Sequence, residues 1–100
     1  MFKSKPIIIL RALSPQELKE FEKFIQSPFF NKNETLSQLF LLLKKEYPDF
    51  SGAGVDRERL FFKLYQSREF DESKLRYAFS DLSKLLEKYI MLKELEKNKI

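Results

Sequence analysis

A helix-start signature that occurs three times constrains the fold of this chain more than any other feature. The fullest copy is Leu13-Ser14-Pro15-Gln16-Glu17-Leu18. Here Ser14 can cap a helix, Pro15 suits its first turn, and Glu17 can reach back to complete a capping box. The flanking leucines are spaced as a hydrophobic staple, and the same spacing recurs in Val55-Asp56 with Leu60 and in Phe70-Asp71 with Leu75. Three such starts in a short chain predict an all-α fold.

The composition agrees with a helical bundle. The chain has 100 residues, enough for one domain over 1–100, and 43% of them are hydrophobic. Eleven of the aromatic residues are phenylalanine, which has no polar group and therefore mostly belongs in a core. Only two glycines and four prolines are present, which leaves little loop for a sandwich or barrel. We therefore expect a single bundle of four to five helices.

Apolar spacing and helix breakers predict five segments. They are 7–13, 15–27, 32–47, 57–66 and 72–97. The first is ambiguous, because three consecutive isoleucines favour a strand whereas Pro6 can open a helix, and we favour the helix. The third should start at Asn31 or Asn33 and be central, because it is apolar nearly all round, Leu41 and Leu42 included. Both glycines lie in the 49–54 loop that follows Pro48.

The last helix suggests where a partner docks. A 26-residue helix over 72–97 is about 39 Å long at 1.5 Å per residue, so its last turns should project beyond the bundle. We expect Tyr89, Met91, Leu92 and Leu95 to lack cover there and to bind a second copy or another helix. The pair Phe29 and Phe30 is a second candidate surface, although a core that extends under the connector explains it as well.

Catalytic and metal chemistry find little support. The chain has no cysteine and no histidine, so the commonest general base and the commonest metal ligands are missing. The aspartates are scattered, and no glycine-rich phosphate loop or calcium loop is present. We expect no enzymatic activity, no metal, no cofactor and no small-molecule substrate.

Charge leaves nucleic acid as the alternative partner. The formal net charge is +4, and acidic and basic residues alternate along the predicted helices. A helix-turn-helix formed by 57–66 and the long helix would present Lys74, Arg76 and Tyr77 to a DNA groove. Acidic residues at Asp71, Glu72 and Asp81 oppose this, so any DNA binding should be weak and salt-sensitive. A protein-interaction or scaffolding module is the leading hypothesis, with a DNA-binding helix-turn-helix domain as the alternative.

Targeting signals are also weak. The apolar run Ile7-Ile8-Ile9-Leu10 is shorter than the hydrophobic region of a signal peptide, and no small-residue cleavage site follows it. No stretch approaches the ~18 apolar residues that span a bilayer. We expect a cytoplasmic protein that does not enter a membrane.

One stretch resembles a known family. The run from Leu13 to Asn31 contains Phe21-Glu22-Lys23-Phe24-Ile25-Gln26-Ser27-Pro28-Phe29-Phe30-Asn31. It is similar to an F-x-x-F-[IL]-x-S-P-[YF]-F-N stretch near the N-terminus of longer, uncharacterised helical proteins, chiefly from Bacteroidetes. The resemblance continues through Tyr47-Pro48-Asp49-Phe50, Lys74-Leu75-Arg76 and Asp81-Leu82-Ser83-Lys84-Leu85-Leu86-Glu87. It implies the N-terminal domain of a longer bacterial protein, and it assigns no activity and no site residue.

Overall fold

The computed structural model describes residues 5–50, 56–66 and 69–97, and these residues form helices and connecting turns without a strand. The helices are α1 (Lys5–Ala12), α2 (Pro15–Gln26), α3 (Glu34–Lys44), α4 (Arg57–Tyr65) and α5 (Glu72–Lys97). The predicted all-α bundle with a long C-terminal helix is confirmed. The ambiguous first segment is helical, as we favoured.

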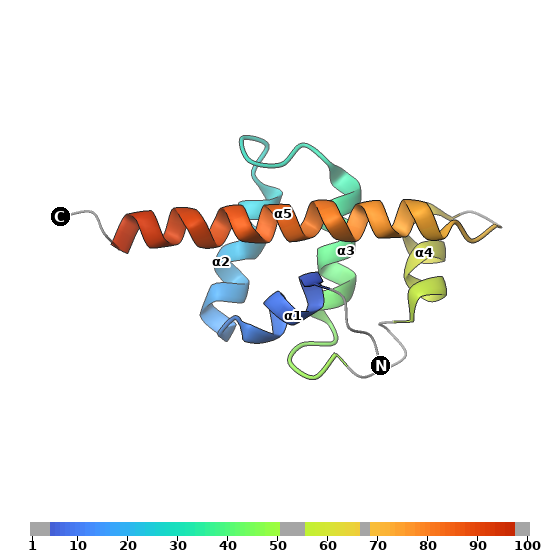
Figure 1. Cartoon of the computed structure of the whole chain (residues 1–100), viewed down its shortest axis with the longest axis horizontal. Coiled ribbons are helices and arrows are strands. Elements are labelled where there is room, and N and C mark those ends of the chain that lie inside the picture. Colours follow the sequence, from blue (N-terminus) through green and yellow to red (C-terminus); the bar gives the residue numbers. More distant parts are fainter. Residues whose placement is uncertain (1–4, 51–55, 67–68, 98–100) are drawn as a thin grey trace.

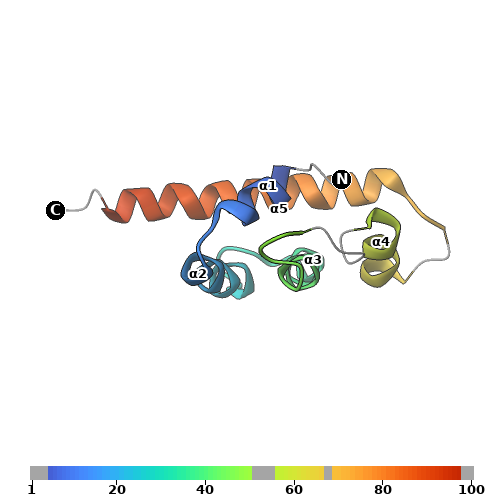
Figure 2. The same ribbon diagram turned by 90° about the horizontal axis from the view of Figure 1, so that it is seen from below.

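The helices form two layers. In Figure 1, α5 runs along the whole length of the molecule, and α2, α3 and α4 lie behind it. Figure 2 shows these three helices side by side beneath α5, with α3 in the middle and α1 beside α5 in the other layer. Helix α5 packs against α1, α2 and α3. The distal end of α5 extends beyond α2, as its length predicted.

Side-chain caps fix the helix starts. The Ser14 hydroxyl accepts a hydrogen bond from the Glu17 N–H at 3.1 Å, and the Glu17 carboxylate accepts one from the Ser14 N–H at 2.9 Å. This is the predicted capping box. Asp56 accepts from the Glu58 N–H and Asp71 from the Ser73 N–H, each at 3.0 Å. The predicted staple partner Val55 lies outside the described residues.

Two asparagines form hydrogen bonds between the end of α2 and the start of α3. Asn33 caps α3 by accepting from the Thr35 N–H at 3.0 Å. Asn31 has a different role: its amide donates to the Ile25 carbonyl at 2.8 Å, and its oxygen accepts from the Asn33 N–H at 3.0 Å. Of the two predicted caps, Asn33 is the helix cap and Asn31 joins the end of α2 to the start of α3.

The third helix is shorter than the predicted 32–47. After Lys44 the backbone bonds change to three-residue spacing, from the Glu46 N–H to the Leu43 carbonyl and from the Tyr47 N–H to the Lys44 carbonyl. The following Pro48 disfavours the helical region for Tyr47, which sets the latest possible end of the helix and does not account for its end at Lys44. The glycines of the predicted loop lie outside the described residues, whereas the neighbouring Phe50 is buried in the core.

One continuous core joins the layers. Phe21, Phe40, Leu39, Leu82 and Leu86 are fully buried in it, together with residues from α1 and α4. The prediction that α3 is covered on nearly all sides is wrong at Leu41, which is 39% exposed, although Leu42 packs against the core. Because α3 has neighbours on two sides in its own layer and α5 above it, its remaining side faces solvent.

Candidate functional site

The distal half of α5 lies over α2, and Tyr89 is the residue that joins them. Its ring packs edge-on against Phe21 at 5.6 Å between centroids and lies 5.8 Å from the Phe24 ring. Tyr89 is 8% exposed. The prediction that Tyr89 lacks cover is therefore wrong, because α2 reaches this turn of α5 and buries the ring.

Beside Tyr89, an ionic cluster connects the same two helices. The Lys93 ammonium donates to Glu17 at 3.0 Å and to Glu20 at 3.2 Å. The Tyr89 hydroxyl donates to Glu20 at 2.6 Å. Glu17 therefore takes part both in the capping box of α2 and in the contact with α5. Sequence reasoning missed this cluster, although Tyr89 and Lys93 lie one helical turn apart in the sequence.

The hydrogen bonds of this cluster change the acidity of its members. The bond from the Ser14 backbone, followed by the one from Lys93, lowers the pKa of Glu17 from 4.5 to about 2. The hydrogen bond from Tyr89 lowers the pKa of Glu20. Burial, followed by the bond to Glu20, raises the pKa of Tyr89 to about 12, and the bond to Glu17 raises the pKa of Lys93. All four groups keep their neutral-pH charge over a wider pH range than usual.

A cleft of about 440 Å³ next to this cluster brings together the two predicted surfaces. Phe30 and Leu92 both line it, and Tyr89 and Phe24 form its apolar wall. The Phe24 and Phe30 rings lie 4.3 Å apart between centroids, and Phe29 meets Phe30 edge-on at 5.0 Å. Sequence reasoning treated the phenylalanine pair and the end of α5 as separate candidates, but they are neighbours.

Most of the remaining predicted residues are accessible. Phe29 is 88% exposed, Leu95 is 59% exposed and Met91 is 55% exposed, while Phe30 and Leu92 are half-buried. Leu95 follows Leu92 by three residues and Met91 by four, so the three share one side of α5. We call Phe29, Phe30, Met91, Leu92 and Leu95 the distal patch.

The predicted DNA-reading residues lie at the other end of α5. Tyr77 is 66% exposed, and the Lys74 ammonium lies 5.7 Å from the centre of the Tyr65 ring on α4. Arg57 of α4 forms an ion pair with Glu72 of α5 at 2.5 Å. Basic and acidic side chains thus alternate on this surface.

Within residues 5–50, 56–66 and 69–97, no group of three or more acidic side chains is placed to hold a metal ion. No helix among these residues has the length and apolarity needed to cross a membrane. Comparisons with protein-family models, curated proteins and solved structures found no match to this chain.

Proposed function

We propose that this chain is a non-enzymatic interaction module that associates with a second copy of itself through the distal patch. The observation that carries the proposal is that Phe30, which the exposed Phe29 meets edge-on, lines one cleft together with Leu92 of α5. Exposed large apolar residues that gather at one place on a surface are typical of interaction sites. Phenylalanine and methionine are also among the residues that protein interfaces favour.

Charge supports a second copy as the occupant. Lys88, Leu92 and Glu96 lie on one ridge of α5, spaced four residues apart. Neither Lys88 nor Glu96 forms an ion pair with another described residue, although Lys88 lies over the Phe30 ring. If two α5 helices cross antiparallel at Leu92, each Lys88 meets the Glu96 of the other copy. A twofold interface must be self-complementary in this way.

The patch is small, so the proposed dimer is weak. Stable interfaces bury about 1,600 Å² in total. The end of one helix and two phenylalanines provide less area than this. The association should therefore depend on concentration. Sedimentation velocity over a wide concentration range should show a reversible monomer–dimer equilibrium, and a chain that stays monomeric throughout would contradict the proposal.

Two pairs of variants make the test specific. Leu95→Glu should shift the equilibrium to monomer, whereas Ile8→Glu should leave it unchanged, because both residues are 59% exposed and only Leu95 belongs to the patch. Lys88→Glu and Glu96→Lys should each weaken the dimer, and the double variant should restore it. A double variant as weak as the single ones would rule out the antiparallel register.

DNA binding by a helix-turn-helix, cytoplasmic location and membership of the bacterial family remain predictions. Glu72, one of the acidic residues that oppose DNA binding, forms an ion pair with Arg57 of α4. A fluorescence anisotropy titration with duplex DNA should show only weak binding that fades as salt rises. A tight, sequence-selective and salt-tolerant complex would instead favour the helix-turn-helix.

A further inference from the structure

We propose that a cleft between α1, α4 and α5 binds a small molecule that carries a diphosphate or an equivalent pair of anionic groups. The cleft has a volume of about 510 Å³, within the range of small-molecule sites. None of its described lining residues belongs to the distal patch, although Glu87 of the cleft and Met91 of the patch are one helical turn apart on α5. The proposal is therefore independent of self-association.

The charge of the cleft favours an anion. Among the described residues, the lining has four basic side chains and one acidic side chain; they are Lys5, Arg57, Arg76 and Lys84, and Glu87. Neither Arg76 nor Lys84 forms an ion pair with a described residue. Arginine suits phosphate because its planar group donates two parallel hydrogen bonds.

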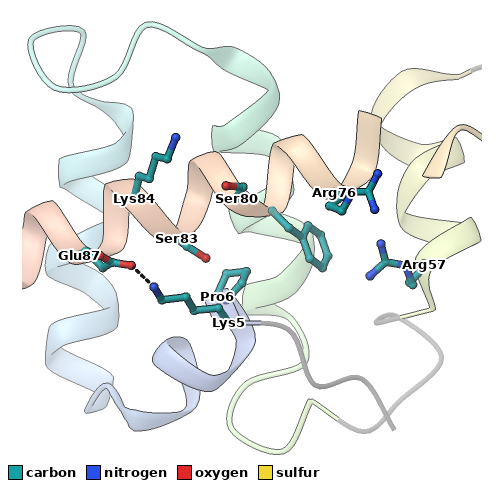
Figure 3. A pocket seen from close by; sticks show the side chains of 9 residues that line it. Lys5, Pro6, Arg57, Arg76, Ser80, Ser83, Lys84 and Glu87 are labelled. Atoms are coloured by element: carbon teal, nitrogen blue, oxygen red, sulfur yellow. Dashed lines mark ion pairs between the residues drawn. The ribbon is translucent and has the colours of Figure 1, made fainter. Parts of the chain in front are cut away.

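Ser83 gives the second, independent observation. It is 5% exposed, and its hydroxyl oxygen is buried without a hydrogen-bond partner among the described residues. A buried hydroxyl that lacks a partner destabilises the fold, so an unpaired one needs an explanation. Ser83 lines the cleft, and in Figure 3 its hydroxyl points toward Lys5 and Pro6. A ligand oxygen at this place would satisfy it.

The arrangement indicates a ligand with two anionic ends. Figure 3 shows Arg57 and Arg76 facing each other at one end of the cleft, while Lys5 and Ser83 lie at the other. Ser83 follows Arg76 by seven residues, which separates their Cα atoms by about 10 Å along the helix. One orthophosphate reaches one end, whereas a diphosphate has the length to contact both.

The cleft is partly preorganised and partly adjustable. Arg57 is held by its ion pair with Glu72 and lies 5.6 Å from the centre of the Phe79 ring. Lys5 pairs with Glu87 at 2.7 Å, but both side chains are more than half exposed. Exposed ion pairs are worth little, so Lys5 can turn from Glu87 to a ligand at small cost.

The test is isothermal titration calorimetry of the whole chain with sodium pyrophosphate, and with orthophosphate in parallel. Pyrophosphate should bind saturably and more tightly than orthophosphate. Arg76→Gln should weaken binding roughly tenfold or more, as expected for a lost charge-assisted hydrogen bond. Arg59→Gln is the matched control, since Arg59 is an exposed base of α4 outside the cleft, and it should bind like the wild type.

Ser83→Ala separates a binding role from a folding role. Without ligand, the variant should unfold at the same or a higher denaturant concentration, because the unpaired hydroxyl is gone. It should nevertheless bind pyrophosphate more weakly. No saturable binding, equal losses in Arg59→Gln and Arg76→Gln, or unchanged binding in Ser83→Ala would each overturn the proposal. Orthophosphate that binds as tightly as pyrophosphate would refute the two-ended ligand.

Discussion

Glu17 takes part in two interactions, and the substitution Glu17→Gln separates them. Glutamine can still close the capping box with Ser14, so the start of α2 should remain intact. The negative charge is lost, and with it the attraction to Lys93 and to the N-terminus of α2. A surface ion pair contributes about 0.2–1 kcal/mol and a first-turn carboxylate about 0.3–1 kcal/mol.

The expected loss of unfolding free energy at pH 7 is therefore about 1 kcal/mol, the middle of the combined range. In a domain of this size, 1 kcal/mol lowers the melting temperature by roughly 4–8 °C. Thermal unfolding followed by circular dichroism at 222 nm measures this directly. The matched control is Glu34→Gln, which removes a first-turn charge of α3 that has no ion pair with a described residue, so its loss should be smaller.

The pH dependence gives the sharper test. The pKa of Glu17 is lowered from 4.5 to about 2 in the folded protein. A lowered carboxyl pKa contributes stability that is complete above the unfolded value and disappears as pH falls through the folded value. The gap between wild type and Glu17→Gln should thus be constant above pH 4.5 and shrink toward pH 2. A gap that persists at pH 2, or no gap at pH 7, would refute this reasoning.

Three further predictions concern stability and the tyrosine. Ser14→Ala should lower the unfolding free energy by about 1 kcal/mol in chemical denaturation, because α2 loses its cap, and no change would mean that the cap contributes nothing. Phe21→Ala should lower the unfolding free energy by about 3–5 kcal/mol and Phe29→Ala by less than about 0.5 kcal/mol, because Phe21 is fully buried and Phe29 is 88% exposed. Similar losses of unfolding free energy in the two variants would contradict the described core. The pKa of Tyr89 is raised to about 12, so Tyr89→Phe should remove the tyrosine that titrates at the highest pH in an ultraviolet titration. An unchanged titration curve above pH 11 would show that Tyr89 is not that tyrosine.

Local sequence signals predicted the helices well because each depends on residues close together in the chain. Ser14 with Glu17 predicted the start of α2, and the unbroken run after Asp71 predicted both ends of α5 correctly. The end of α3 was harder to predict. The hydrogen bonds after Lys44 join residues three apart instead of four, and this change does not alter the apolar pattern of the sequence.

The sites depend on contacts between distant segments, and here the sequence was less informative. Tyr89 belonged to the predicted surface, yet α2 covers it. Its hydroxyl donates to Glu20 of α2, which lies 69 residues earlier in the chain. Ser83 was missed, although a serine placed among Phe79, Leu82 and Leu86 on the buried side of a helix is a readable irregularity. The basic cleft was not predictable, because only the packing of α1 on α5 brings Lys5 near Ser83.

The packing of α1 against α5 also bears on how the chain folds during synthesis. Helices α2 and α3 are neighbours in sequence and in space, so they can dock soon after both have emerged from the ribosome. Helix α1 has eight residues, too few to be stable alone, and its main partner is α5, the last of the described helices in chain order. Ile7 and Leu10 thus remain exposed until α5 is complete. A nascent chain stalled before α5 should therefore be more susceptible to proteases in α1 than the finished protein.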